Sequence, residues 1–300
     1  IRDRANAVLA QARETIAGLL GADPVEVIFT GSGTEADNLA IRGFAGTPGA
    51  RIVSTPIEHP AVRETVTDLE KRGAAVDLLP AGPDGLVQLT DALDQPAAVV
   101  TCMWANNETG AIQPIADVIS RATATDSPVH VDAVQVVGHL PVDFHALGAT
   151  TLAASAHKFG GPRGVGILLA RRSPAPSPVL TGGGQQRGLR PGTVDVAAAA
   201  ATAAALEEAV AEMDAENKRL SKLRDDLIVA ITHSIPDAYA TVRAAEQLPH
   251  VLPGHAHLTF PGANGDAMIM LLDSHGIEAS TGSACNNGVN QRSHVLEAMG

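Results

Sequence analysis

Along most of this sequence, short apolar runs that suit β-strands alternate with segments whose apolar residues recur at helical spacing. This alternation is typical of an α/β fold, in which helices cover a mostly parallel sheet. The expected strands are Val25–Thr30, Arg51–Thr55, Ala75–Leu79, Ala97–Met103, Val129–Asp132, Thr151–Ala154 and Val165–Leu169. The expected helices between and before them are Arg4–Leu19, Glu35–Gly43, Pro60–Arg72 and Pro114–Thr123. We therefore predict an α/β fold whose sheet is mostly parallel.

The pattern changes at Asp195, where a stretch rich in Ala, Glu, Lys and Arg continues to His233. A helix of this length is too long for a simple crossover, so we interpret it as a connection between domains. After it we expect a strand at Ala256–Phe260, a helix at Gly265–His275, a short strand at Ile277–Ala279, a loop around Cys285 and a helix from Ser293. The predicted division is a large domain over residues 1–194, a connecting helix over 195–233 and a small domain over 234–300.

Composition excludes several classes of protein. The 300 residues are 45% hydrophobic, which excludes disorder, and two cysteines cannot form the framework of a disulfide-rich domain. A net charge of −12, with only one Trp, one Tyr and five Phe, argues against a nucleic-acid surface. No apolar run approaches the roughly 20 residues of a membrane span, and the first residues lack the apolar core of a secretory signal. We expect a cytoplasmic protein and, since the sequence does not begin with Met, a longer precursor.

Polar residues with matching chemistry follow three of the expected strands. Gly31-Ser32-Gly33-Thr34 precedes a helix and can direct free N–H groups at an anion, Asp132 ends a strand with Gln135 close behind, and Ser155-Ala156-His157-Lys158 follows a third strand. Open α/β sheets bind ligands at the carboxyl ends of their strands. A phosphate cradle, a carboxylate and a lysine amine are the groups that pyridoxal 5′-phosphate (PLP) requires, so we predict PLP as the cofactor.

Taken one at a time, these residues also have structural interpretations. Asp132 can cap a helix or lie on the surface, His59 can cap the helix that Pro60 begins, and Asn107 can close a turn. Cys285 can be an inert small residue, whereas Cys102 lies in an apolar run and is expected to be a core thiol. His255 and His257 are two residues apart without a cysteine or acid at ligand spacing, so no metal site is predicted.

Seven motifs, spread over nearly the whole chain, carry a specific resemblance. They are FTGSGTEADNLAIRG, IEHPAV, MWANNETGAIQPI, VHVDAVQVVGHLPVDF, SAHKFGGPRGVG, GGGQQRGLRPGT and EASTGSACNNG. In this order they resemble the cysteine desulfurases of the class V aminotransferase fold. The Ser-Ala-Cys loop is similar to that of group I members, which are associated with iron–sulfur-cluster assembly and tRNA thiolation. The resemblance implies a PLP-dependent transferase of fold type I with a smaller α+β C-terminal domain, and conversion of L-cysteine to L-alanine.

The resemblance also implies roles for individual residues. Lys158 matches the lysine that holds the cofactor, Asp132 the carboxylate at its pyridine nitrogen, and Cys285 the nucleophile that receives sulfur as a persulfide. His59 matches the imidazole stacked on the ring, which is proposed to move protons. The phosphate-binding set of the family is matched by Gly33, Thr34, Ser155 and His157. The two side chains near the phenolic oxygen are matched by Asn107 and Gln135. Thr193 matches a threonine that reaches the neighbouring subunit's phosphate, which implies a homodimer with shared sites.

The sequence departs from the family pattern in some places. Family members usually have an additional segment before the first helix and an arginine that binds the substrate carboxylate beyond the last one, and Pro191 and Gln185 replace the usual serine and histidine. The leading interpretation is a cysteine desulfurase that passes sulfur to an acceptor or scaffold protein. Two alternatives stay open: another class V PLP enzyme that catalyses β-elimination or transamination, and a truncated chain that serves as a non-catalytic scaffold.

Overall fold

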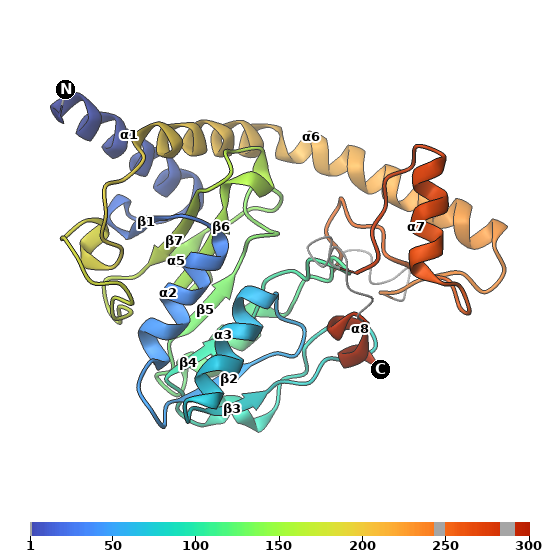
Figure 1. Cartoon of the computed structure of the whole chain (residues 1–300), viewed down its shortest axis with the longest axis horizontal. Coiled ribbons are helices and arrows are strands. Elements are labelled where there is room, and N and C mark those ends of the chain that lie inside the picture. The colour runs from blue at the N-terminus through green and yellow to red at the C-terminus, as the bar shows by residue number, and fades with distance from the viewer. Residues whose placement is uncertain (1, 243–249, 283–291) are drawn as a thin grey trace.

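The computed structural model describes residues 2–242, 250–282 and 292–300. A seven-stranded sheet in the order β1-β7-β6-β5-β4-β2-β3 forms its centre (Figure 1). The strands are β1 (Val27–Thr30), β2 (Arg51–Ser54), β3 (Ala75–Leu78), β4 (Val99–Thr101), β5 (Val129–Asp132), β6 (Thr151–Ser155) and β7 (Gly166–Ala170). The pairings from β3 through β2, β4 and β5 to β6 are parallel, while β7 runs antiparallel to both β6 and β1. The predicted α/β fold with a mostly parallel sheet is confirmed.

Helices cover both faces of this sheet, as the continuous burial along β1, β5, β6 and β7 requires. The α-helices are α1 (Arg2–Leu20), α2 (Gly33–Ala45), α3 (Pro60–Lys71), α4 (Ile115–Thr123), α5 (Phe144–Leu147), α6 (Val196–Ser234), α7 (Gly265–Ser274) and α8 (His294–Met299). Short 3₁₀ helices span η1 (Pro24–Glu26), η2 (Asp91–Asp94), η3 (Ala156–Phe159) and η4 (Gln186–Gly188). Among the described residues, none of the helices is both long enough and apolar enough to cross a membrane.

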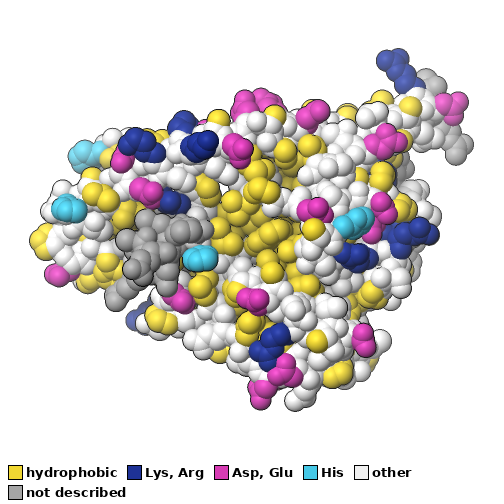
Figure 2. All heavy atoms as spheres, turned by 180° about the vertical axis from the view of Figure 1, so that it is seen from behind, with side chains coloured by type: hydrophobic (Ala, Val, Ile, Leu, Met, Phe, Trp, Pro, Cys, Tyr) yellow, Lys and Arg dark blue, Asp and Glu magenta, His cyan; other side chains and the backbone are white. Residues whose placement is uncertain are grey.

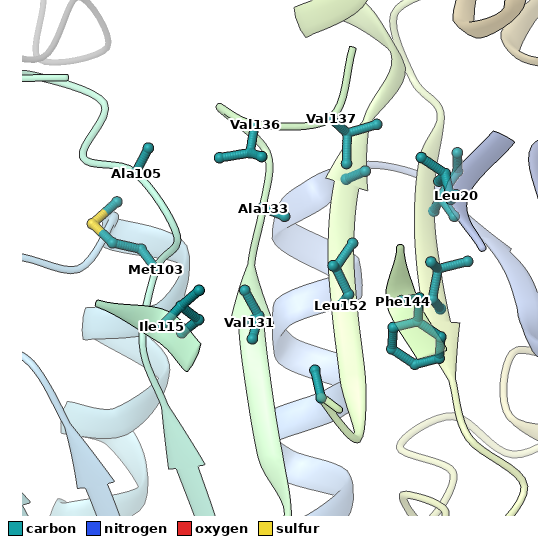
Figure 3. Close-up of a cluster of buried hydrophobic side chains, with 14 of the residues drawn as sticks. Leu20, Met103, Ala105, Ile115, Val131, Ala133, Val136, Val137, Phe144 and Leu152 are labelled. Carbon is teal, nitrogen blue, oxygen red and sulfur yellow. The ribbon is translucent and has the colours of Figure 1, made fainter. Parts of the chain in front are cut away.

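The hydrophobic core divides between the two faces. On one face, α1, α4 and the first part of α6 pack on the sheet, with Leu20, Val131 and Leu152 among the fully buried side chains (Figure 3). On the other face, α2 and α3 cover the sheet through two smaller clusters that include Leu39 and Val62. This packing holds α2 and α3 so that both begin at the carboxyl edge of the parallel strands.

Helix α6 is 39 residues long and is capped by Asp195, whose side chain accepts a hydrogen bond from Ala198 N. Its first part lies beside α1, and its second part extends to the C-terminal elements (Figure 1). Near that end the buried Arg224 donates to the carbonyl groups of Val251 and Leu252. The predicted long helix is therefore confirmed, with bounds that differ by one residue.

Other sequence predictions were wrong in detail. Ile277–Ala279 is not a strand; the described small sheet instead pairs β8 (Tyr239–Ala240) with β9 (Leu258–Thr259). The strand predicted at Ala97–Met103 is limited to β4, because the chain pairs with β2 and β5 only over its middle residues. Pro24 starts a 3₁₀ turn, so β1 begins at Val27 rather than at Val25.

Candidate active site

Three strand ends and one helix start meet at the carboxyl edge of the sheet. Gly33, the first residue of α2, approaches the chain after β5 and the end of β6: a Cβ atom on Gly33 would lie 2.8 Å from Val134 Cγ2 and 3.3 Å from Ser155 Cβ. Only glycine allows this approach without a shift of the neighbouring atoms. The loops that the sequence analysis predicted to meet are thus in direct contact.

The start of α2 has the chemistry of an anion cradle. Ser32 caps the helix by accepting a hydrogen bond from Glu35 N at 3.1 Å. The N–H groups of Gly33 and Thr34 occupy the first helical positions, which helix geometry leaves without an intrahelical partner. Across from them, the Ser155 hydroxyl lies 2.9 Å from His157 Nδ1. A phosphate fits this set of donors.

Asp132 is a buried carboxyl group at the end of β5. Its Oδ1 accepts a hydrogen bond from Val134 N at 2.9 Å. Burial raises the pKa of Asp132, and the hydrogen bond from Val134 N, followed by the nearby His59 and Lys158 side chains, opposes that rise. A group that brings a further positive charge, such as a protonated pyridine nitrogen, stabilises the ionised carboxylate here. Asp132 therefore fits the pyridine partner that PLP requires.

Lys158 lies on η3, directly after β6. Its side chain is exposed, and its positive charge acts on both Asp132 and His59. The 3₁₀ turn is closed by Gly160 at φ 84°, and its backbone is held by His139, whose Nε2 lies 2.9 Å from Lys158 O. The turn thus presents a primary amine at the edge of the site.

His59 is the N-cap of α3. Its Nδ1 accepts a hydrogen bond from Ala61 N at 3.1 Å, and Pro60 occupies the first helical position. Burial lowers the pKa of His59, so the ring is neutral near pH 7. Because Nδ1 acts as an acceptor, the remaining ring proton is on Nε2. The capping contact therefore fixes the tautomer and leaves Nε2–H available to a ligand.

Asn106, rather than Asn107, closes the turn between β4 and the following segment. Asn106 Oδ1 accepts hydrogen bonds from the N–H groups of Glu108 and Thr109, both at 2.9 Å, and its Nδ2 donates to Ile57 O. Asn107 is half-buried beside this turn. The turn ties the Asn107 segment to the segment that carries His59.

Gln135 is half-buried and lines a cavity of about 180 Å³ together with His139, Asn217 and His255. Burial lowers the pKa of His255 to about 4, and its Nδ1 has no hydrogen-bond partner among the described residues. Lys158 is close enough to contribute to the same shift. The cavity therefore extends from the site toward the C-terminal elements.

The other candidate residues lie elsewhere or outside the description. Thr193 is exposed, in the segment just before α6. Cys285 falls outside the described residues. Cys102 is fully buried one residue after β4, and burial raises the pKa of its thiol well above the usual range, as expected for a core thiol.

The sequence analysis did not single out Glu58, which is fully buried next to His59. Its Oε1 accepts hydrogen bonds from Met103 N at 3.0 Å and Thr55 Oγ1 at 3.3 Å, while Oε2 has no partner among the described residues. Burial, followed by the charge of Asp132, raises the pKa of Glu58 to about 8. The only sequence feature that could have pointed to Glu58 is its position directly before the candidate residue His59.

A second pair that the sequence analysis missed is His130 and Asp37. His130 Nε2 lies 3.1 Å from Asp37 Oδ1, and its Nδ1 lies 2.9 Å from Thr151 Oγ1. Burial lowers the pKa of His130 to about 3 and raises that of Asp37 well above its usual value, so burial disfavours the charged form of both groups. The signal was the two-residue spacing from Asp132, which places both side chains on one face of β5.

Comparison with known proteins agrees with this geometry. The aminotransferase class-V family model matches residues 1–299. An IscS-like cysteine desulfurase of Mycobacterium tuberculosis is 48% identical over 97% of this chain and 77% of the relative. The cysteine desulfurase IscS of Dictyoglomus turgidum is 40% identical over 97% of this chain and 74% of the relative.

Two solved structures are similar throughout. A NifS-like protein superimposes with a TM-score of 0.87 at 35% identity, covering 99% of this chain and 79% of that one. SspA in complex with cysteine gives a TM-score of 0.82 at 30% identity, covering 100% of this chain and 84% of that one.

The sheet, the anion cradle, the buried carboxyl group and the lysine together define a PLP-dependent enzyme of fold type I. The chain belongs to the class V aminotransferase family and, within it, to the IscS-like cysteine desulfurases.

Proposed function

We propose that this chain converts L-cysteine to L-alanine and transfers the sulfur to Cys285 as a persulfide. The observation that carries the proposal is the meeting of the α2 N-terminus, Asp132 and Lys158 at one edge of the sheet. The relatives that are cysteine desulfurases support the reaction, and the structural relative solved in complex with cysteine supports the substrate.

The site residues divide into those that hold the cofactor and those that act on the substrate. The Gly33 and Thr34 N–H groups, with Ser155 and His157, would hold the phosphate, and Asp132 the pyridine nitrogen; Asn107 and Gln135 would lie near the phenolic oxygen. Lys158 Nζ would bind the aldehyde carbon. When bound, PLP supplies an electron-withdrawing ring that accepts electron density released at the substrate α-carbon.

Proton movement is assigned to two groups. When it is not bound to the aldehyde carbon, Lys158 Nζ would accept the α-proton of L-cysteine. His59 carries its proton on Nε2, since Nδ1 is occupied by Ala61 N, and so acts first as a proton donor.

The sulfur step balances with the Cys285 thiol as the second reactant. The deprotonated sulfur of Cys285 attacks the sulfur of the substrate, an S–S bond forms and the substrate Cβ–S bond breaks. The electron pair of the broken bond stays with the β-carbon, which takes up one proton, equal in number to the proton that the Cys285 thiol has released. L-cysteine and a thiol thereby give L-alanine and a persulfide, without an external oxidant or reductant.

The proposal extends to partners, location and domain organisation. The persulfide sulfur would pass to an acceptor or scaffold protein, in iron–sulfur-cluster assembly or tRNA thiolation, in the cytoplasm. Residues 1–194 would form the large domain, 195–233 the connecting helix and 234–300 part of a small domain.

A homodimer would bring Thr193 to the neighbouring site. On the face seen in Figure 2, apolar side chains gather in a central hollow, a feature typical of interfaces.

The test is incubation of the PLP-loaded chain with L-cysteine. Alanine should accumulate, and mass spectrometry should find one added sulfur on the Cys285 peptide and none on the Cys102 peptide. Cys285→Ser should abolish alanine formation while PLP stays bound. Release of sulfide and pyruvate at an undiminished rate by Cys285→Ser would contradict the proposal and favour β-elimination.

A further inference from the structure

Two consecutive residues at the start of α8 contact the two segments that carry His59 and Asn107. Ser293 Oγ donates a hydrogen bond to Glu108 Oε2, and His294 Nε2 lies 2.9 Å from Glu58 O. Glu108 directly follows Asn107, and Glu58 directly precedes His59. The start of α8 is therefore joined to both sides of the candidate site.

Glu108 also lies close to Gly282, the last described residue before the 283–291 stretch. A Cβ atom on Gly282 would lie 3.2 Å from Glu108 Oε2 and 3.5 Å from Ser293 Cβ. Gly282 has a φ of 62°, which glycine adopts without strain. One carboxyl group thus lies beside Gly282 and accepts a hydrogen bond from Ser293, although ten residues separate these two in the sequence.

Burial and backbone hydrogen bonds fix the position of Glu108. Its side chain is 7% exposed, and its N–H donates to Asn106 Oδ1, whose amide group in turn donates to Ile57 O. Helix α8 is held from its other side by Val295 and Met299, which are buried in the main hydrophobic cluster. Glu108 is therefore a rigid support rather than a surface charge.

We propose that Glu108 is a positioning residue that holds Gly282 and Ser293 against the Asn107 segment. Because these two residues flank the stretch that contains Cys285, Glu108 thereby fixes where that stretch is attached relative to the substrate. This inference rests on the proposed function, in which Cys285 accepts the sulfur. Glu108 acts through its two contacts and not on the cofactor, so its removal slows sulfur transfer without weakening PLP binding.

Five variants of the PLP-loaded chain, one of them a control, separate this role from a general loss of stability. Glu108→Ala removes the acceptor, and Glu108→Gln keeps an oxygen at the same distance from Ser293. Ser293→Ala removes the donor, and it is also combined with Glu108→Ala. Glu297→Ala, on the exposed side of α8, is the matched control for loss of a glutamate side chain.

The first measurement is amide hydrogen exchange of α8. Loss of one buried hydrogen bond should raise exchange of residues 295–299 by about tenfold in Glu108→Ala and Ser293→Ala. Glu108→Gln should stay within about threefold of the wild type, since an acceptor remains. Glu297→Ala should exchange like the wild type. Equal exchange in the wild type and Glu108→Ala would overturn the proposal.

The second measurement is the rate at which sulfur first appears on Cys285, beside the dissociation constant of PLP. Glu108→Ala should lower that rate by about tenfold and leave the dissociation constant within about threefold. The double variant should lose no more than Ser293→Ala, because Ser293→Ala already removes the hydrogen bond to Glu108 together with the Ser293 cap on Leu296 N. A parallel loss of PLP affinity, or losses that multiply, would overturn the positioning role. A wild-type chain that places no sulfur on Cys285 would contradict the proposed function, and α8 exchange would still decide whether Glu108 holds the helix.

Discussion

Among the site residues, Asp132 combines a functional role with a cost in stability. The raised pKa of Asp132 indicates that burial opposes its ionised form in the chain without cofactor. A neutral amide of the same size keeps the acceptor for Val134 N and removes that cost. Residues of this kind are typical of functional sites, where a locally unfavourable group is retained for its chemistry.

We predict opposite effects of Asp132→Asn on stability and on turnover. The cofactor-free variant should unfold at a higher urea concentration than the wild type. Its free energy of unfolding should be higher by about 1 kcal/mol or more. Alanine formation should fall by about 100-fold, since the pyridine nitrogen loses its charged partner. Urea unfolding and steady-state turnover measure the two effects. Wild-type turnover by a folded Asp132→Asn would show that Asp132 is only a cap.

Glu58 predicts a pH dependence whose sign can be worked out. Its pKa is about 8 in the folded chain against 4.5 as the ordinary value, so the folded state keeps a proton that the unfolded state releases. The stabilising effect of that proton is complete below pH 4.5 and is lost as the pH rises to about 8. The free energy of unfolding of Glu58→Gln, minus that of the wild type, should therefore increase as the pH rises through this window.

The comparison needs only urea unfolding of the two cofactor-free proteins between pH 4.5 and 9. The difference should grow by at most about 1.4 kcal/mol per pH unit and level off above pH 8. Groups that do not interact with Glu58 are common to both proteins and cancel in the difference. A difference that does not change with pH would mean that Glu58 is ionised in the fold.

At the scale of elements, the close approach of α2 to β6 depends on Gly33. A methyl group there would meet Val134 Cγ2 at 2.8 Å and Ser155 Cβ at 3.3 Å, which pushes the helix start away from the site. We predict that Gly33→Ala lowers PLP affinity by about tenfold or more and costs about 1–3 kcal/mol of stability. Fluorescence titration with PLP and urea unfolding measure these effects.

Gly18 offers a matched control in α1. A Cβ atom on Gly18 would contact nothing within 4 Å, and its backbone is helical. Gly18→Ala should therefore stabilise the chain by about 0.5–1 kcal/mol without a change in PLP affinity. If both substitutions alter PLP affinity equally, the effect of Gly33→Ala does not come from the contact with Ser155.

Elements were more predictable from the sequence than contacts between them. Thr151–Ser155 and Arg51–Ser54 form strands within one residue of the prediction, because apolar runs between turn residues are local signals. The parallel-sheet rule also predicted that the Gly33 loop and Ser155 would meet. Glu58, Glu108 and the contact between His130 and Asp37 were missed because their partners are far away in the sequence.

At the scale of the whole molecule, the proposed homodimer assigns Thr193 to the site of the neighbouring subunit. Thr193 is exposed, while the segment before it is attached to its own chain: Arg190 pairs with Glu35 at 2.7 Å, and Gly192 N donates to Gln185 Oε1 at 3.2 Å. These contacts fix the segment and leave the hydroxyl on the surface. An exposed residue held in this way can complete a site in a second copy of the chain.

We predict that chains carrying Lys158→Ala and chains carrying Thr193→Ala restore each other when co-expressed. In a mixed dimer with shared sites, one site has both substitutions, and the other has the intact Lys158 of one chain and the intact Thr193 of its partner. Half of the dimers are mixed, so about a quarter of all sites should behave like the wild type. Alanine formation is measured at a PLP concentration that leaves Thr193→Ala homodimers mostly empty, with each variant alone as the control. Activity no greater than the average of the two controls would mean that Thr193 serves its own chain, and the shared site would then be wrong even if the protein is a dimer.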